Sequence, residues 1–300
     1  MNIRAQIASN RRQTIVMLLL FTLTILGIIF VASLASGDPE VFPFFSAIAT
    51  GFIFLWTLFS YYFGDKMILS FVGAKPIERK THFDIYNLVE NLAITAGLPN
   101  PTVYIIEDAS LNAFATGRNP QHSVICLTTG IIEKLDKRQL EAVLAHEMGH
   151  IANYDIRLQL MVITVIGAIA MLGEIMMRVR GKKAGGIILA GAVIYFIGAP
   201  LLRLIRMALS RNREYLADAT GSFYTRDAWA LAEALELIAE DSRVESADRM
   251  NSAAHLFIAN PKNEPDTSSS KKIQEQSWLT RLFSTHPPIQ DRIKRLKGFD

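Results

Sequence analysis

Long uncharged stretches alternate with amphipathic ones along this chain. Residues 14–35 and 41–64 contain no charged side chain, and only five residues separate them. Each stretch is long enough to cross a hydrocarbon core of roughly 30 Å. The pair predicts a transmembrane hairpin within residues 1–65, although the small residues at the end of the first stretch also allow a signal peptide.

A second pair of uncharged stretches occupies residues 158–173 and 184–202. It predicts a second hydrophobic hairpin and brings the expected hydrophobic helices to four. Basic residues flank both ends of the first hairpin, which places those ends in the cytoplasm by the positive-inside bias. Residues 178–183 carry four positive charges that would face the other side. Two interpretations of the second hairpin therefore remain. It either crosses the membrane twice, or it is shallow or buried in protein.

Residues between the two hairpins have the patterns of a folded domain. A helix is expected to start at residues 81–84, with a capping-box-like carboxylate, and to end at Gly97. Three β-rich runs predict a small sheet over residues 102–107, 111–117 and 123–127. The second run is either an edge strand on which an extended substrate adds as a further strand, or a plain structural hairpin.

A helix with strong end signals follows the sheet. Asp136 is the expected N-cap, Gln139 lies three residues on, and helical spacing continues to about Asn153. Charged residues begin this helix and polar residues follow it. The helix is therefore not expected to be a membrane span itself.

This helix contains the sequence HEMGH at residues 146–150. His146 and His150 lie on one helix face because 3.6 residues make a turn. Neutral imidazoles are zinc ligands, and Glu147 can take the proton of an attacking water molecule. The pattern predicts the metal-binding helix of a zinc peptidase. The alternative is an ordinary helix with two surface histidines.

A catalytic zinc ion needs a third protein ligand besides two histidines. Glu214, in the sequence RNREYLAD, is the candidate, and Asp218 follows one turn later on the same helix face. The first carboxylate can bind the metal, while the second orients a ligating imidazole by accepting its other N–H. A surface carboxylate pair on an amphipathic helix is the alternative interpretation.

The C-terminal region combines helical patterns with a polar segment. Residues 226–240 predict a helix whose buried face carries Trp229, Ala232, Leu235 and Ile238. Residues 246–259 predict another helix, residues 260–277 predict a loop, and a basic helix begins at Ile289.

Composition narrows the possible classes of function. Half of the 300 residues are hydrophobic, and the net charge of +3 is spread along the chain, which does not favour nucleic-acid binding. Cys126 is the only cysteine, so an internal disulfide and a cysteine-based zinc site are excluded. It is expected to be a small buried strand residue, and the lack of disulfides fits a reducing compartment.

Four motifs together resemble one family. HEMGH, RNREYLAD, LNAFATG and STHPPIQDRI are similar to the motifs of the HtpX-type membrane zinc metalloproteases of the Ste24/HtpX group. The similarity covers essentially the whole chain, although residues 260–277 do not match the family pattern. It implies a mostly α membrane protein: four hydrophobic helices plus a zincin-like (gluzincin) α+β catalytic domain with a small β-sheet.

The resemblance also implies the roles of individual residues. One zinc ion per chain would be bound by His146, His150 and Glu214. Glu147 would act as general base, and Asp218 would support a ligand.

The same resemblance implies substrate contacts. Asn112, Ala113 and Phe114 would line the substrate edge. His286 and Arg292 fall on the family's C-terminal motif and are expected to steady the developing oxyanion. A histidine before two prolines could equally cap or pack.

The chain is expected to divide into four parts. They are an N-terminal transmembrane hairpin (1–65), the first part of a cytoplasmic catalytic domain (66–157), the second hydrophobic hairpin (158–202) and the second part of the catalytic domain (203–300). Both ligand-bearing helices adjoin the second hairpin, so the zinc is expected within about two helical turns of the membrane surface.

The expected function is that of an integral-membrane zinc-dependent endopeptidase that cleaves membrane proteins or their cytoplasmic segments by metal-activated water. The resemblance implies the bacterial cytoplasmic (inner) membrane, with membrane-protein quality control and a stress response as the setting. Expected partners are the lipid bilayer and membrane-protein or unfolded polypeptide substrates. The alternative is a non-catalytic zinc-containing membrane protein that binds unfolded segments. An intramembrane protease is a weaker alternative because charges flank the motif helix.

Overall fold

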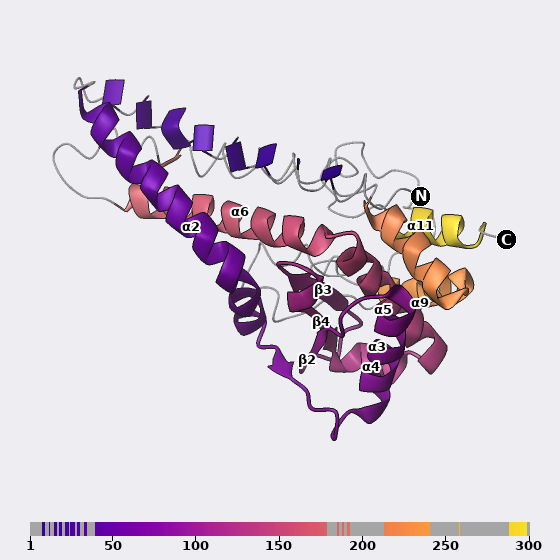
Figure 1. Ribbon diagram of the computed structural model, residues 1–300. Coiled ribbons are helices and arrows are strands. Elements are labelled where there is room, and N and C mark those ends of the chain that lie inside the picture. The colour runs from indigo at the N-terminus through magenta and orange to yellow at the C-terminus, as the bar shows by residue number, and fades with distance from the viewer. Residues whose placement is uncertain are drawn as a thin grey trace. The chain divides into compact units, whose positions relative to one another are not determined.

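The structure is a computed structural model. It describes residues 40–178, 213–240 and 288–298, together with Ile258 and isolated positions within residues 8–34 and 185–192. Figure 1 labels the helices and strands of these segments.

The chain forms two compact units. The first, which we call the apolar unit, comprises Met1–Gly64 and Leu160–Arg206. The second, which we call the site unit, comprises Asp65–Gln159 and Met207–Asp300. The HEMGH motif and Glu214 both belong to the site unit.

Helix α2 (Val41–Phe71) covers the second uncharged stretch and continues beyond it. Among the described residues, one helical stretch is long and apolar enough to cross a membrane, namely Ser46–Phe71 within α2. The expected total of four hydrophobic membrane helices is not confirmed, since residues 14–35 and 184–202 lie largely outside the described ranges.

The end of α2 differs from the prediction. The helix continues past Gly64 and stops only at Phe71, just before Gly73, whose φ of 70° is left-handed. Asp65 and Lys66 end the uncharged stretch 41–64, but charged side chains are compatible with helical backbone. Glycine in a left-handed conformation is the common helix stop.

A four-stranded mixed sheet forms the centre of the site unit. Its strands are β1 (Lys75–Pro76), β2 (Thr102–Ile106), β3 (Ala113–Gly117) and β4 (Ser123–Thr128). They lie in the order β1-β2-β4-β3, with β2 parallel to β4 and the other neighbours antiparallel. β3 is therefore an edge strand of this sheet, as one of the two interpretations of the run 111–117 requires.

The predicted strands are confirmed apart from their ends. β3 begins at Ala113 rather than at Leu111, because the Asn112 N–H is donated to a side-chain hydroxyl of β4 and not to a backbone carbonyl. The Asn112 N–H donates to Thr128 Oγ1 at 3.0 Å, and the Thr128 N–H donates to the Asn112 carbonyl at 3.1 Å. Cys126 is fully buried in β4, as predicted, and burial raises the pKa of its thiol.

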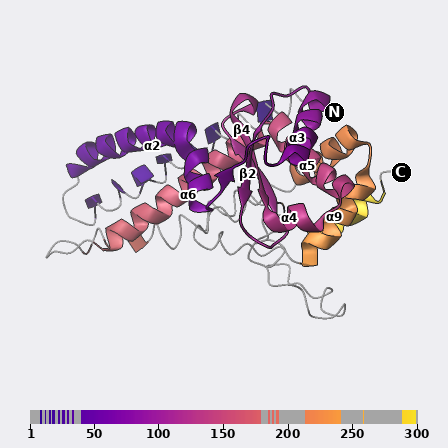
Figure 2. The ribbon, with the colours of Figure 1, turned by 90° about the horizontal axis from the view of Figure 1, so that it is seen from below.

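Helices cover this sheet. Those of the site unit are α3 (Phe83–Ala96), α4 (Thr129–Lys134), α5 (Lys137–Ala152), α9 (Ala228–Glu240) and α11 (Ile289–Leu296), with a further helix at residues 213–225. In both Figures 1 and 2, α3 and α5 lie side by side on the same side of the sheet. α5 contacts α3, α9 and β3, so it is the central helix of the unit.

Of the two capping boxes predicted from the sequence, one is confirmed and the other is wrong. At α5 the capping box is confirmed: Asp136 accepts from the Gln139 N–H at 2.8 Å, and the Gln139 side chain accepts from the Asp136 N–H at 3.1 Å. At α3 the expected capping box is wrong. The N-cap is His82, which makes no side-chain cap bond. Thr81 lies one residue before the N-cap, and its hydroxyl donates to the Glu78 carbonyl.

One hydrophobic core joins the sheet to α3, α5 and α9. Ala232, Leu235 and Ile238 of α9 are fully buried in it, as predicted. Trp229 was expected on the same buried face, and this is wrong, since it is 43% exposed. Its ring lies 5.4 Å from the Lys297 ammonium, a cation–π arrangement that suits a half-exposed aromatic side chain.

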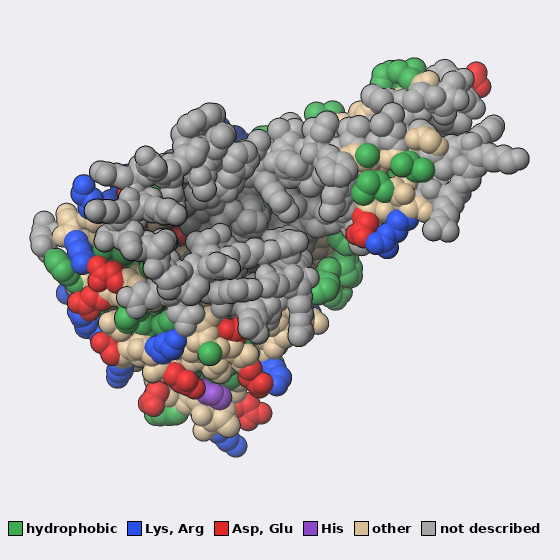
Figure 3. Space-filling model, turned by 180° about the vertical axis from the view of Figure 1, so that it is seen from behind, with side chains coloured by type: hydrophobic (Ala, Val, Ile, Leu, Met, Phe, Trp, Pro, Cys, Tyr) green, Lys and Arg blue, Asp and Glu red, His purple; other side chains and the backbone are tan. Residues whose placement is uncertain are grey.

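The surface of the site unit mixes charges of both signs. On the face shown in Figure 3, acidic and basic side chains are interspersed over the described residues. The predicted helix at 246–259, apart from Ile258, and the predicted loop at 260–277 lie outside the described residues.

Candidate metal centre

His146 and His150 project from one face of α5, as their spacing of four residues requires. Their ring centroids are 4.8 Å apart and the rings are nearly perpendicular. His146 is 0% exposed and His150 is 5% exposed. The alternative of two surface histidines is therefore wrong.

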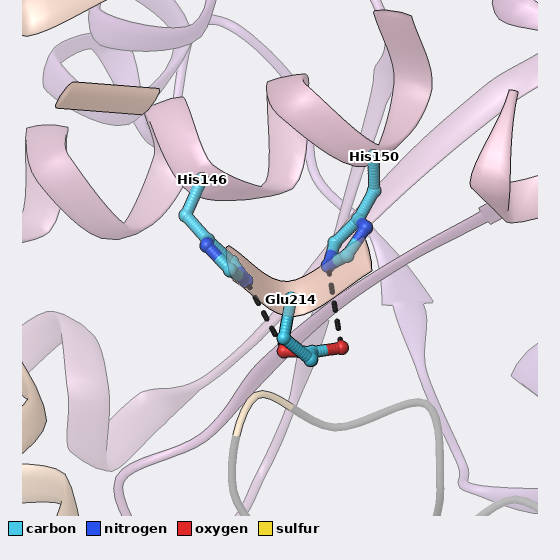
Figure 4. A group of neighbouring side chains, drawn as sticks. All are labelled: His146, His150 and Glu214. Carbon is cyan, nitrogen blue, oxygen red and sulfur yellow. Dashed lines mark ion pairs between the residues drawn. The ribbon is translucent and has the colours of Figure 1, made fainter. Parts of the chain in front are cut away.

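Glu214 faces both histidines from the helix at 213–225 (Figure 4). One carboxylate oxygen lies 3.8 Å from His146 Nε2, and the other lies 3.8 Å from His150 Nε2. The potential ligand atoms of the three residues all lie within 4.8 Å of one another. Glu214 and Asp218 are both buried, so the surface carboxylate pair is excluded.

Two glycines allow the ligand-bearing helices to approach closely. A Cβ atom on Gly221 would lie 2.8 Å from the His146 backbone nitrogen, and one on Gly149 would lie 3.1 Å from the Ala217 carbonyl oxygen. The first distance is shorter than real Cβ contacts. Glycine at these positions is what brings Glu214 within reach of the histidine pair.

A carboxylate supports each imidazole from behind. His146 Nδ1 lies 2.9 Å from Asp218, and His150 Nδ1 lies 3.1 Å from Asp155. Because a carboxylate can only accept, each Nδ1 carries a proton, and Nε2 is the nitrogen of each ring that can bind a metal. The Asp218 contact was predicted. The Asp155 contact was not, although an acidic residue shortly after the second histidine was a visible signal.

Two buried arginines complete the group. Arg292 of α11 donates from Nε and Nη2 to Asp218 at 2.9 and 2.7 Å, and its Nη1 lies 3.4 Å from Glu214. Burial opposes the charge of Arg292, but Asp218 and Glu214 outweigh it and raise the pKa of the guanidinium above its ordinary value. Arg213 is also buried and interacts electrostatically with Asp155 and Glu214.

Glu147 lies beside the histidines and is 1% exposed. Its carboxylate accepts a hydrogen bond from the Ala115 backbone N–H of β3. Burial, reinforced by the charge of Glu214, raises the pKa of Glu147 to about 7. A carboxyl group with such a pKa can both take up and release a proton near neutral pH.

The charges of this site fit a divalent cation. Among the described residues, every buried side chain with a formal charge belongs to this group: Glu147, Asp155, Arg213, Glu214, Asp218 and Arg292. When all four carboxylates are ionised and both imidazoles are neutral, as metal binding requires of the imidazoles, four carboxylates against two guanidinium groups leave two negative charges. Burying such an excess is costly unless a cation compensates it.

The distances fit zinc as well. Two ligands at about 2.1 Å from a tetrahedral zinc lie about 3.4 Å apart. Each histidine Nε2 lies 3.8 Å from a different oxygen of Glu214, and the three ligand atoms lie within 4.8 Å of one another, so a bound zinc ion would draw them closer together. The donor set of two imidazoles and one carboxylate is also typical of catalytic zinc.

The two imidazoles differ in proton affinity. Burial and the nearby Arg292 lower the pKa of His146, against the opposing effect of Asp218. Burial also acts to lower the pKa of His150, but Asp155, Glu214 and Glu147 outweigh it and raise this pKa to about 9. A metal ion must therefore displace a proton from His150 at neutral pH.

Three of the residues expected to contact the substrate lie at the edge strand β3. Ala113 and Phe114 lie in the edge strand β3, with Asn112 just before it, and all three are buried. The Ala113 carbonyl accepts a hydrogen bond from the Ile258 N–H at 2.8 Å. His286 lies outside the described residues, so its expected role stays a prediction.

Comparison with known proteins places the chain among peptidases. Its residues 79–300 match Peptidase family M48. It is 42% identical over 260 residues to a protease HtpX homolog of Thermoanaerobacter pseudethanolicus, covering 82% of each chain. It is 37% identical over 306 residues to a protease HtpX homolog of Caldanaerobacter subterraneus subsp. tengcongensis, covering 97% of this chain and 96% of that one.

A solved structure has a similar fold. The crystal structure of S. mikatae Ste24p aligns with 97% of this chain and 66% of its own length, with a TM-score of 0.50 and 18% identical residues. At that identity the likeness concerns the fold alone. The mostly helical architecture with a small sheet is thus shared with that protein.

Proposed function

The chain belongs to peptidase family M48 and is a metalloprotease, and on this premise we propose that it is a zinc-dependent endopeptidase held in a membrane. One observation carries the proposal: the ligand atoms of His146, His150 and Glu214 lie within 4.8 Å of one another. Glu147, the candidate base, is buried beside them.

His146 and His150 would bind one zinc ion through Nε2, and Glu214 through its carboxylate. Three protein ligands leave a coordination position for water or substrate, whereas structural zinc sites are closed by four. Within the described ranges, the group of possible ligands has these three members. This supports a catalytic site over the non-catalytic alternative.

Glu147 would move the proton during hydrolysis. When bound, zinc polarises the scissile carbonyl and acidifies water. The Glu147 carboxylate takes the proton of the attacking water and delivers it to the leaving amine. Its pKa, raised to about 7 by burial, suits both transfers, and the bond from the Ala115 N–H holds the carboxylate at β3.

The edge strand β3 would hold the substrate. Asn112, Ala113 and Phe114 are at the start of this edge, next to the Glu147 carboxylate bonded to Ala115. A polypeptide that adds as a further strand would place its peptide bonds along that edge through main-chain hydrogen bonds, and it would replace the Ile258 N–H as the partner of the Ala113 carbonyl. Unfolded segments have the free backbone that this binding mode needs.

The proposed setting is the bacterial cytoplasmic membrane, with the active site on the cytoplasmic side. The apolar stretch Ser46–Phe71 supports membrane attachment by its length and composition. The two relatives compared above are bacterial proteins named as proteases. Substrates would be membrane proteins or their cytoplasmic segments, and the proposed role is membrane-protein quality control.

Replacing Glu147 by Gln tests the proposed mechanism. The variant keeps the size and the hydrogen-bonding oxygen of the side chain but cannot accept the proton of water. Purified in detergent, it should bind as much zinc as the wild type, and its cleavage of an unfolded protein substrate should fall at least about 100-fold. Cleavage at the wild-type rate would contradict the proposed role of Glu147.

A further inference from the structure

Asp155 is the carboxylate that holds His150. Its Oδ2 atom lies 3.1 Å from His150 Nδ1, and both side chains are buried. A buried carboxylate is costly unless it is paired. Asp155 is paired with His150 and is also attracted electrostatically by the buried guanidinium of Arg213.

The backbone between α5 and α6 (Asp155–Met177) is shaped to make this contact. α5 ends with Asn153 as C-cap, and Tyr154 follows with a positive φ of 59°. A left-handed conformation is unfavourable for an aromatic residue, so surrounding structure must maintain it. The turn lets α6 begin at the very next residue, and its first side chain faces back to the metal centre.

These contacts argue against Asp155 being only an acidic residue that stabilises the start of a helix. An acidic residue in the first turn of a helix is favourable because of the helix dipole, but it gains this benefit while exposed to water. Asp84, in the first turn of α3, is such an exposed residue. Asp155, in contrast, has no exposed surface and a histidine nitrogen as its partner.

We propose that Asp155 is a positioning residue of the metal centre. It accepts the Nδ1–H of His150, which fixes the tautomer with Nε2 facing Glu214 and increases the basicity of that nitrogen toward the metal. The proposal rests on the metal-binding function proposed above. It makes the two histidines equivalent, since Asp155 does for His150 what Asp218 does for His146.

A consequence concerns α6. Because Asp155 is the first residue of this hydrophobic helix, the orientation of a metal ligand depends directly on where the helix begins. Replacing Tyr154 by Gly would relax the left-handed turn without removing Asp155.

The test uses the full chain in detergent and measures zinc affinity by competition with a chromophoric chelator. Asp155→Ala should weaken zinc binding about 10- to 100-fold, and Asp155→Asn should weaken it less, because the amide oxygen still accepts the Nδ1–H. The cobalt-substituted forms should show an altered visible absorption spectrum, which reports the ligand field rather than stability. Asp84→Asn, the matched control, should leave affinity and spectrum unchanged.

The outcomes separate this inference from the proposed function. If the wild type binds zinc and Asp155→Asn and Asp155→Ala bind it with wild-type affinity and spectrum, Asp155 is not a positioning residue although the metal centre stands. If the wild type binds no zinc, the proposed function itself fails. Should Asp155→Ala not fold, Asp155→Asn, which preserves volume, decides the result through its cobalt spectrum.

Discussion

Each metal-facing side chain of this site is held by a second polar group. Asp218 supports His146, Asp155 supports His150, and Arg292 lies 3.4 Å from Glu214. The two imidazoles are therefore held by contacts with carboxylates, and the Glu214 carboxylate is held by an ion pair with Arg292. A metal ion entering such a site meets donors close to their final positions, which lowers the cost of binding.

The pH dependence of metal binding follows from His150. Its pKa is raised to about 9, so at neutral pH the imidazole is protonated in the metal-free protein and cannot be a ligand. Zinc affinity should rise with pH up to about 9, by roughly tenfold per pH unit, with release of one proton. Below about pH 7, where Glu147 also takes up a proton, the dependence should become steeper.

Chelator competition at a series of pH values, together with proton release measured in weakly buffered solution, checks this expectation. Asp155→Asn removes the carboxylate that raises the His150 pKa, so its affinity should depend less on pH. An affinity that is constant between pH 7 and 9 in the wild type would contradict the assignment.

Sequence spacing could predict only the locally encoded part of the site. The positions of His146, Glu147 and His150 follow from one helix, and Asp218 follows from its place one turn after Glu214. Asp155 could not be assigned, because its direction depends on the left-handed turn at Tyr154.

The pairing of Arg292 with Asp218 spans 74 residues of sequence, so only the folded chain reveals it. Neither residue lies in a pattern that would indicate the other. The predicted contact of Arg292 with a developing oxyanion stays a prediction beside these observed contacts.

At the scale of helices, the site depends on the close crossing of α5 with the helix at 213–225. Gly149 and Gly221 lie at this crossing, where any Cβ atom would meet backbone of the other helix. Backbone cannot move aside as a flexible side chain can. The distance between the two helices therefore sets the distance between Glu214 and the histidines.

Gly221→Ala should separate these helices. The added methyl group would lie 2.8 Å from the His146 nitrogen, so the protein should lose about 1–3 kcal/mol of stability and bind zinc more weakly. Denaturant unfolding and chelator competition measure the two effects. Gly298→Ala, whose Cβ would meet neighbours at an ordinary 3.6 Å, serves as control, and equal zinc affinity in both variants would argue against the role of the crossing.

Helices and strands with a clear periodic hydrophobic pattern were predicted well. Elements that form only through contacts with other elements were not. β2, β4 and α5 have strong local signals, and their predicted ranges are correct within a residue or two. β1 has only two residues and exists through its pairing with β2. α4 is a six-residue helix whose N-cap is Thr128, the last residue of β4, so no separate signal marks it.

At the scale of the whole molecule, the chain joins the site unit, which holds the candidate metal centre, to the apolar unit, and the stretch Ser46–Phe71, long and apolar enough to cross a membrane, begins in the apolar unit and ends in the site unit. The proposed orientation puts the site unit in the cytoplasm. The sequence alone could predict membrane-spanning segments, because the length of an uncharged segment can be recognised without knowing any tertiary contact. It could not establish the number of crossings.

Cysteine labelling in bacterial cells tests the orientation. Cys126 is fully buried and its thiol pKa is raised, so it should not react with the label. The native cysteine therefore need not be replaced before labelling. A new cysteine at Lys137, an exposed position at the start of α5, should react with a membrane-impermeant maleimide only after the cytoplasmic membrane is opened. Reaction in intact spheroplasts would place the site unit on the opposite side.

The most direct test of the metalloprotease centre is a zinc titration of activity. Zinc is removed with a chelator, added back in steps to a known concentration of protein in detergent, and cleavage of an unfolded protein is measured at each step. We expect no cleavage without zinc and a linear rise that ends at one equivalent per chain, with Glu214→Gln needing far more zinc. Cleavage by the zinc-free protein, or a rise that continues to two equivalents, would contradict it.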